Sequence, residues 1–429
     1  MLKLELCQSF SVHINIPKDE LNVNDLIIFC KNASHRFFQL LFDKLVTRLQ
    51  QHILEQVLGA AWKPHQRIAA PWECPRCRSR YGFRRRGRRT RSLKTSVGSV
   101  SFSLFQVTCC DCNKTFSPFP KLFAIASRHR ISRELEKLMC SVVKDLSYAK
   151  TAKTVNLFCE VQLSPHSVHK TVQHYGARAA IVEDLSHITH LEIDSTKINA
   201  ADNERGIDVH LALSVGASHR KGKRIYRDKH LVNVEVAQHP EATKQVLKKS
   251  HVDQVVLDGH SGLEDYIQKE KLPMTIQRCL FHVPRTAAHM LYLDGLSCIE
   301  GRDLVKPMKK FLFNENVSVK KRLRQYDSFL FECRKKGYTS TATFLENARP
   351  NLYTYKQFAE TDLHGRTIST VERQFREVNR RMENGARWTP AGAQNLLNIK
   401  LIEELNNQSY DYLWKVRKKC KSSFEVILC

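Results

Sequence analysis

Three acidic residues in the second half of the chain stand where folding could bring their carboxylates together. Asp194 ends the apolar-alternating segment HITHLEID, and Asp258 ends the short apolar run VVLD. Both segments read as strands, so neighbouring strands would carry the two carboxylates to one edge of a sheet. Glu372 lies near the start of an amphipathic helix pattern in STVERQFREVNRRMENGARW. Three such carboxylates can hold two Mg²⁺ or Mn²⁺ ions, which activate an attacking oxygen and stabilise the leaving one.

Other acids compete for two of these positions. Glu192 would share a strand face with Asp194, because side chains alternate with a period of two. We nevertheless favour Asp194, which stands at the end of the strand pattern. The DGHSG segment could also be a turn in which Asp258 only caps backbone groups. The remaining competitors are Asp202 and Asp208 for the first acid, and Glu377 and Glu383 for the third.

A cysteine and a histidine follow Asp258 in the segment QRCLFH. They are Cys279 and His282, three positions apart. Two side chains do not complete a zinc site, which takes four ligands. We therefore favour a structural role, in which this pair packs and hydrogen-bonds the following segment against the sheet beneath the acids.

Two CxxC pairs lie in the first third of the chain. Four thiolates in two such pairs make the tetrahedral site that one Zn²⁺ prefers, and the alternating residues between them predict the strands of a zinc ribbon. Cys110 is an additional thiol, but the CxxC spacing favours its neighbour. A redox pair or unrelated reduced thiols are the alternatives. The predicted ligands are Cys74, Cys77, Cys109 and Cys112.

An arginine-rich run lies between the two CxxC pairs. A metal-clamped hairpin with arginines suits contact with phosphates or insertion into a DNA minor groove, although a basic loop that is merely solvated would look the same. The arginines are Arg84, Arg85, Arg86, Arg88, Arg89 and Arg91.

The segment SYAKTAKTVNLFCEVQLSPHSVHKTVQHYG is typical of a helix-turn-helix. Ser164 is a plausible N-cap with Pro165 in the first turn of the second helix. Ala149, Ala152 and Val155 would face inward on the first helix, and Val168 and Val172 on the second. Any short helical hairpin with polar outer faces shares this pattern. The residues predicted to face DNA are His166, Ser167, His169, Lys170 and Gln173.

Composition favours a nucleic-acid partner. The 429 residues carry a formal net charge of +26, which repels itself unless a polyanion neutralises it. A membrane surface is the weaker alternative, since there is no run of about 18 apolar residues. The start MLKLELCQSF lacks the layout of a secretion signal. We therefore expect reduced cysteines and a cytoplasmic, nucleoid-associated protein without a membrane partner.

Changes in pattern divide the chain into six parts. Helix-period apolar residues run from Val23 to Leu58, and residues 3–16 alternate as a strand would. From Ile188, the pattern predicts three strands, a helix over Glu241 to Ser250, and a fourth strand. The predicted parts are 1–63, a strand and helical module; 64–125, the zinc ribbon; 126–180, the helix-turn-helix-like domain; 181–282, the first part of a catalytic core; 283–365, a helical insertion; and 366–429, the rest of the core.

The segments LEIDST, VVLDGHSGLEDYI, QRCLFH and STVERQFREVNRRMENGARW together resemble the DDE-type insertion-sequence transposases of the Mutator-like superfamily. In that superfamily, a C-x-x-H motif follows the second catalytic acid, and a helical insertion precedes the third. The likeness spans roughly residues 188 to 429. It implies an α/β ribonuclease H-like core, in which helices flank a mixed sheet, with a helical insertion, preceded by the zinc ribbon and helical DNA-binding modules.

The resemblance also implies a reaction and its partners. Asp194, Asp258 and Glu372 would hold two Mg²⁺ or Mn²⁺ ions during cleavage at the terminal inverted repeats and strand transfer into target DNA. Two ends must be held together, so a homodimer or larger assembly is expected. A domesticated or inactive transposase-derived DNA-binding protein, and a zinc-ribbon RNA-binding protein, are the alternatives. Trp388 could stack on an unpaired base, although a core position is the simpler reading. Residues expected near DNA phosphates are Arg285, Arg373, Arg376, Arg380 and Arg381.

Overall fold

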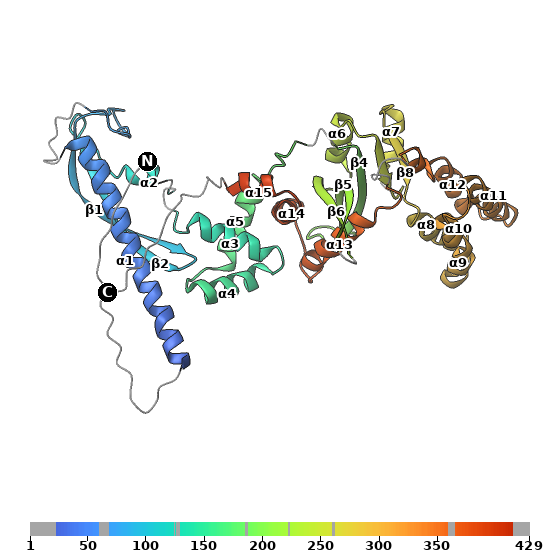
Figure 1. Cartoon of the computed structure of the whole chain (residues 1–429), viewed down its shortest axis with the longest axis horizontal. Coiled ribbons are helices and arrows are strands. Elements are labelled where there is room, and N and C mark those ends of the chain that lie inside the picture. Colours follow the sequence, from blue (N-terminus) through green and yellow to red (C-terminus); the bar gives the residue numbers. More distant parts are fainter. Residues whose placement is uncertain are drawn as a thin grey trace. The chain divides into compact units, whose positions relative to one another are not determined.

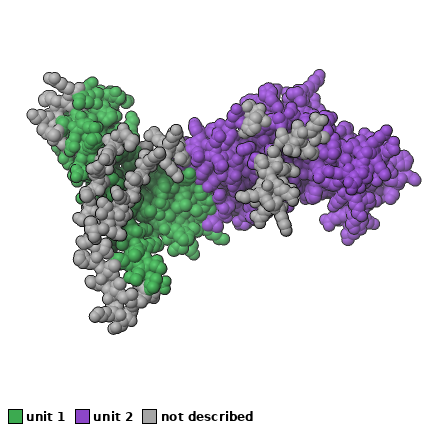
Figure 2. All heavy atoms as spheres, in the orientation of Figure 1, with its two compact units in different colours: residues 1–142, 148–168 green, residues 143–147, 169–429 purple. Residues whose placement is uncertain are grey.

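The structure is a computed structural model, in which the chain forms two compact units (Figure 2). Unit 1 comprises residues 1–142 and 148–168, and unit 2 comprises residues 143–147 and 169–429. The strand predicted within residues 3–16 lies outside the described residues. Those described are 23–59, 68–123, 125, 129–184, 188–221, 224–259, 262–358 and 365–414.

Unit 1 contains a long helix packed on a small antiparallel sheet of order β1-β2-β3 (Figure 1). Leu54 and Val57 of the helix join Phe102 and Leu104 of β2 in one apolar core. Gln50 fixes the position of the helix along β2. Its side-chain N–H donates to the Ser103 carbonyl at 2.8 Å, and its side-chain oxygen accepts the Phe105 N–H at 2.9 Å. The elements are α1 (Val23–Leu58), β1 (Phe83–Thr95), β2 (Gly98–Cys109) and β3 (Thr115–Phe116).

Four further helices follow the sheet: α2 (Phe119–Leu122), α3 (Arg133–Val143), α4 (Tyr148–Cys159) and α5 (Pro165–Gly176). The turn between α4 and α5 is closed by Asn156, whose amide donates to the Leu163 carbonyl and accepts from the Leu163 N–H. The hydroxyl of Ser164 accepts the Ser167 N–H, as the predicted N-cap requires. One inward prediction is wrong, because Ala149 is exposed.

Unit 2 is built on a five-stranded mixed sheet of order β6-β5-β4-β7-β8. Strand β5 runs antiparallel to both of its neighbours, β4 and β6, whereas β7 runs parallel to β4 and β8 parallel to β7. The predicted order of three strands, a helix and a fourth strand is confirmed, but β8 was not predicted. The strands are β4 (His190–Ile198), β5 (Ile207–Lys221), β6 (Arg224–Val236), β7 (Gln254–Leu257) and β8 (Thr275–Arg278).

Helices cover both faces of this sheet. Leu191 and Ile193 of β4 pack with Leu247 and Leu263 of the helices on one face. The alternate residues of β4 turn to the other face, because neighbouring side chains of a strand point in opposite directions. The first face carries α6 (Glu241–Lys249) and α7 (Leu263–Lys269), and the second carries α13 (Ser369–Met382) and α14 (Pro390–Leu405), which α15 (Asn407–Trp414) follows.

A helical insertion separates β8 from α13 (Figure 1). It has its own apolar core, in which the Tyr326 hydroxyl donates to the Leu345 carbonyl at 2.8 Å. Its elements are α8 (His282–Leu293), α9 (Cys298–Leu304), α10 (Lys306–Phe313), α11 (Val319–Lys335), α12 (Thr339–Ala348) and the short 3-10 helices η1 (Arg349–Asn351) and η2 (Thr354–Phe358). In the described part of the chain, no helix is both long and apolar enough to span a membrane.

Candidate active site and metal centre

The sheet places Asp194 and Asp258 next to each other. In the parallel pairing of β4 with β7, Ile193 lies opposite Leu257. Asp194 directly follows Ile193, and Asp258 directly follows Leu257. Both are largely buried, with 9% and 8% of their surface exposed. Two strands that are distant in sequence therefore deliver two carboxylates to one place.

Helix α13 adds the third predicted acid. Glu372 lies in the first turn of α13, and Val371, Phe375 and Val378 bury the inner face of the helix as its pattern predicted. Burial, together with the negative charges of Asp258 and Glu372, raises the pKa of Asp194 to about 8. Asp258 and Glu372 are therefore both close enough to Asp194 to repel its ionised form. The cation of Arg285 acts in the opposite direction on the same carboxyl.

Glu192 competes with Asp194 in the sequence, but the structure gives it a different role. It is fully buried, and its carboxylate accepts the backbone N–H groups of Thr370 and Val371 at 3.0 and 3.4 Å. The Thr370 hydroxyl also donates to it at 3.2 Å. A carboxylate in this position satisfies N–H groups that the first turn of a helix leaves unpaired, and it complements the positive end of the helix dipole. Glu192 therefore holds the start of α13, in the same turn as Glu372.

The remaining competitors lie elsewhere. Asp202 is exposed, and Asp208 lies 4.0 Å from the Lys197 ammonium. Glu377 forms an ion pair with Arg380 at 2.9 Å on the exposed side of α13. Glu383 is the residue after the end of that helix.

The segment QRCLFH ties the acids to the surrounding structure. Gln277 fixes the end of the insertion, because its amide donates to the Leu352 carbonyl and accepts from the Tyr355 N–H. The Arg278 guanidinium is buried and donates to the Asp258 carbonyl at 3.2 Å and to the Glu264 carboxylate. These contacts hold the turn that follows β7.

Gly259 leaves the space that Arg278 fills. A Cβ atom at Gly259 would lie 1.0 Å from a terminal nitrogen of the guanidinium, and the backbone has φ +93°. Both conditions require glycine directly after Asp258. The glycine of the DGHSG segment therefore allows an arginine to brace the backbone of the second acid.

Cys279 and His282 both reach α13. The Cys279 thiol accepts the Ile368 N–H at 3.4 Å, just before the helix begins, and burial raises the pKa of this thiol to about 12. The His282 Nε2 lies 3.3 Å from Glu372 Oε1. The predicted structural pair thus lies between the sheet and the helix that carries the third acid.

Basic residues around the acids have unequal access to solvent. Arg285, Arg373 and Arg376 are exposed, and Arg380 is exposed but paired with Glu377. The prediction for Arg381 is wrong. Its side chain is only 3% exposed and donates to the Val143 carbonyl at 2.9 Å, so it has no surface to offer a phosphate.

Trp388 is a core residue. It is 6% exposed, its indole N–H donates to the Met382 carbonyl at 3.0 Å, and the Arg381 guanidinium lies 5.0 Å from its ring centroid. Because both ring and N–H are engaged inside the protein, it cannot stack on a base without unfolding this corner.

A second site is formed by cysteines in unit 1. Cys74, Cys77, Cys109 and Cys112 place their sulfur atoms within 4.8 Å of one another. Cys74 lies 3.5 Å from Cys112, and Cys77 lies 3.5 Å from Cys109. Cys110 stands outside this group, as the spacing predicted. This cluster could hold a structural metal such as zinc.

The chemistry of the four sulfur atoms fits a cation. Burial opposes ionisation of Cys74, but hydrogen bonds from the Cys77 and Arg76 backbones lower its pKa to about 7. Burial raises the pKa of Cys109 and Cys112. Four thiols this close can lose their protons together only if a positive ion compensates the charge. Among the described residues, only these four form so tight a group, so the three acids are spaced more widely.

The arginines of β1 form a basic strip beside this cluster. Arg84, Arg86 and Arg89 are exposed. Arg85 and Arg88 are exposed too, and their guanidinium carbons lie 4.7 and 4.6 Å from the centroid of the Phe105 ring.

Two predicted DNA contacts are less available than expected. Arg91 is only partly exposed and donates to the His129 carbonyl at 2.6 Å. Gln173 of α5 is partly buried, and its side-chain oxygen accepts from the Asn395 amide at 2.6 Å, so the prediction that it faces outward is wrong.

The neighbouring positions of α5 follow the prediction. His166, His169 and Lys170 are exposed, and Ser167 is partly exposed. Val168 and Val172 are fully buried. The outer face of α5 is therefore polar over residues 166–170 and carries the positive charge of Lys170.

These observations define a class of protein. It is an α/β protein with a mixed sheet, flanking helices, a helical insertion and neighbouring acids at the end of the central strands. The family model described as "Transposase, Mutator family" matches residues 31–409. The chain belongs to the Mutator family of transposases. Among solved structures, the Drosophila P element transposase strand transfer complex is similar at 12% identity, covering 68% of this chain and 96% of that chain with a TM-score of 0.39. A comparison with curated protein sequences finds no match.

Proposed function

We propose that this transposase belongs to an insertion sequence, binds the terminal inverted repeats of its element, and cuts and joins DNA strands with a DDE trio. The catalytic residues in this proposal are Asp194, Asp258 and Glu372. The observation that carries it is the convergence of three buried or half-buried carboxylates from β4, the end of β7 and the first turn of α13.

The mixed sheet supports a ribonuclease H-like core. Its order, β6-β5-β4-β7-β8, combines three antiparallel strands with two that run parallel to β4. The first acid lies on the central strand, and the second follows the strand beside it. The register of β4 with β7 alone brings these two acids side by side.

The donor set fits divalent cations. Asp194, Asp258 and Glu372 offer hard oxygen ligands, and the repulsion that raises the pKa of Asp194 would be relieved by positive charge. Two Mg²⁺ or Mn²⁺ ions bound here would activate an attacking oxygen and stabilise the leaving oxygen. A pair of ions spreads its ligands over more space than a single ion does, in keeping with the wider spacing of these acids.

The protein's own residues supply position and charge. Glu192 and Cys279 fix the start of α13, so that Glu372 is held toward the sheet. Arg278 braces the backbone of Asp258. The exposed Arg285 beside Asp194 is placed to bind a phosphate of the strand being cut.

DNA binding follows from the basic modules upstream. Zn²⁺ held by the cysteine cluster would clamp the arginine strip of β1, and the outer face of α5 would add His169 and Lys170. A formal net charge of +26 favours duplex DNA as the partner. Because two element ends must be cut and joined together, the active form would be a homodimer or a larger homo-oligomer.

The decisive experiment is strand cleavage of duplex DNA that carries the terminal repeats flanking the gene. Nicking should require Mg²⁺ or Mn²⁺ and disappear in Asp194→Ala and Asp258→Ala, while gel-shift binding of the same DNA is retained. Asp202→Ala is the matched control, since this acid is exposed and should leave nicking intact. Nicking that persists in both active-site variants would refute the assignment. Binding without any nicking would favour a DNA-binding protein that has lost its chemistry.

A further inference from the structure

A cavity of about 550 Å³ opens between α8, α9 and α10 of the insertion. Such a volume is ordinary for a small-ligand site. Its walls combine aromatic rings with cations: Phe281, His289 and Tyr292 supply rings, and Arg285, Arg302 and Lys309 supply positive charge.

The rings and one cation form a row along α8. Phe281, Arg285, His289 and Tyr292 are separated by four, four and three positions, so they lie on one face of the helix over roughly 16 Å. Phe281 and Tyr292 are 54% and 52% exposed, although both are large and apolar. The rings of His289 and Tyr292 are nearly parallel, at 23°, with centroids 6.5 Å apart. Flat surfaces are thus presented to the cavity instead of being packed inside the protein.

This row begins at the acids. Phe281 directly precedes His282, which contacts Glu372 at 3.3 Å. Arg285, one turn later, acts electrostatically on Asp194. Arg285 lines the cavity, so the end of the cavity at Arg285 lies within electrostatic reach of Asp194.

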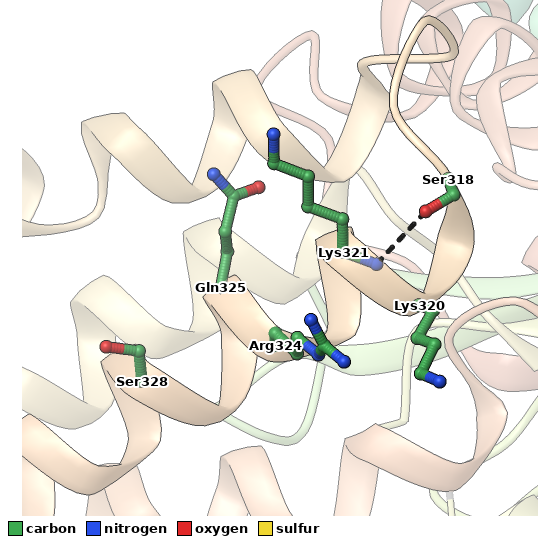
Figure 3. A pocket seen from close by; sticks show the side chains of 6 residues that line it. All are labelled: Ser318, Lys320, Lys321, Arg324, Gln325 and Ser328. Atoms are coloured by element: carbon green, nitrogen blue, oxygen red, sulfur yellow. Dashed lines mark hydrogen bonds between the residues drawn. The ribbon is translucent and has the colours of Figure 1, made fainter.

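A second cavity, at the start of α11, shows a different chemistry (Figure 3). It has a volume of about 510 Å³ and is lined by Lys320, Lys321 and Arg324 with three polar residues. No aromatic side chain lines it. Its cations could attract phosphates, but it offers no surface on which a base could stack.

We propose that the cavity along α8 binds an unpaired nucleotide of the DNA strand next to the cleaved bond. The base stacks on Phe281 or Tyr292, and the flanking phosphates contact Arg302 and Lys309. This inference rests on the proposed function, because it takes its DNA strand from the acids beside it. An intact duplex hides its base faces by stacking, so only a nucleotide released from the duplex fits the rings.

Binding of single-stranded oligothymidylate tests the aromatic contacts. Loss of one base–aromatic stack weakens binding about 5- to 150-fold, so Phe281→Ala and Tyr292→Ala should lower single-strand affinity within this range and leave duplex affinity nearly unchanged. Phe331→Ala is the matched control, because this ring is 63% exposed on α11 and does not line the cavity. Equal loss for duplex and single strand, or no loss in either cavity variant, would overturn the proposal.

Cross-linking locates the base directly. Cys298 is exposed and lines the cavity, so an oligothymidylate whose base carries a tethered pyridyl disulfide should exchange with its thiol, forming a mixed disulfide and releasing pyridinethione. Cys298→Ser should remove this cross-link. A cross-link that persists in Cys298→Ser would place the base elsewhere and refute the site.

Failure of the cavity and failure of the proposed function are distinguishable. If Asp194→Ala abolishes nicking while Phe281→Ala leaves single-strand binding unchanged, the function stands and the cavity does not hold the base. If single-strand binding depends on Phe281 but nicking survives loss of the acids, the cavity stands and the catalytic assignment fails.

Discussion

The substitution Asp194→Asn should stabilise the metal-free protein. The pKa of Asp194 is raised from 3.8 to about 8, first by burial and then by the charges of Asp258 and Glu372. Between these two values, the folded state binds a proton that the unfolded state has lost. The free energy of unfolding therefore falls as the pH rises through this window. The contribution of Asp194 to stability is complete only below the unfolded pKa of 3.8.

The size of the stabilisation at pH 7 follows from the difference between that pH and the unfolded pKa of 3.8. One pH unit corresponds to about 1.4 kcal/mol, so keeping Asp194 protonated at pH 7 costs about 4 kcal/mol relative to a group that is always neutral. Asparagine has a similar shape and no charge. The variant should exceed the parent in stability by about 4 kcal/mol at pH 7 and by almost nothing near pH 4. For a unit of this size, such a gain raises Tm on the order of 10 °C.

Calorimetry in the presence of a chelator measures both proteins at the two pH values. Added Mn²⁺ should then raise the Tm of the parent but not of Asp194→Asn, because the cation needs the carboxylate. Asp202→Asn, at an exposed position, should change neither value. A variant that is less stable than the parent at pH 7, or a difference that is the same at both pH values, would refute the view that burial and the neighbouring acids raise the pKa of Asp194.

Three further predictions concern the surrounding structure. Metal analysis should find about one zinc per chain in the parent and in Cys110→Ser, but almost none in Cys77→Ser, because only the second variant removes a ligand from the cluster. Glu192→Gln should lower the free energy of unfolding by about 1 to 2 kcal/mol and slow nicking without weakening DNA binding, since α13 loses a charged cap. Gly259→Ala should cost about 2 kcal/mol or more by calorimetry, because a Cβ atom would displace the Arg278 guanidinium and the positive φ disfavours alanine; an unchanged Tm would show that the turn can rearrange freely.

Sequence pattern predicted the elements that carry the acids. The apolar alternation before Asp194 and the run before Asp258 correspond to β4 and β7, and the spacing of Val371, Phe375 and Val378 corresponds to the inner face of α13. These patterns are local consequences of burial, so they can be read without knowing the fold. The fifth strand of the sheet, β8, is not predicted because its residues, TIQR, contain one apolar side chain and so form neither an apolar run nor an alternation, whereas β7 reads QVVL.

The choice between Glu192 and Asp194 needed the tertiary structure. The two share a strand face, and no local feature of HITHLEID says which one meets a helix N-terminus and which one meets Asp258. Only the position of α13, reached from residues almost 180 positions away, separates the two roles. The partners of Gln277, 75 and 78 positions away, likewise leave no trace in the local pattern.

By itself, the sequence determined the residue types available for chemistry: four cysteines at zinc-ligand spacing, acids at the ends of two strands, and a strong excess of positive charge. Tertiary structure decided which of these residues meet. The parallel pairing of β4 with β7 joined two acids, the docking of α13 added a third, and burial removed Arg381 and Trp388 from the surface. The physical reason is that residue type and periodicity are local properties, whereas electrostatic interaction and access to DNA depend on distances between segments that only the folded chain brings together.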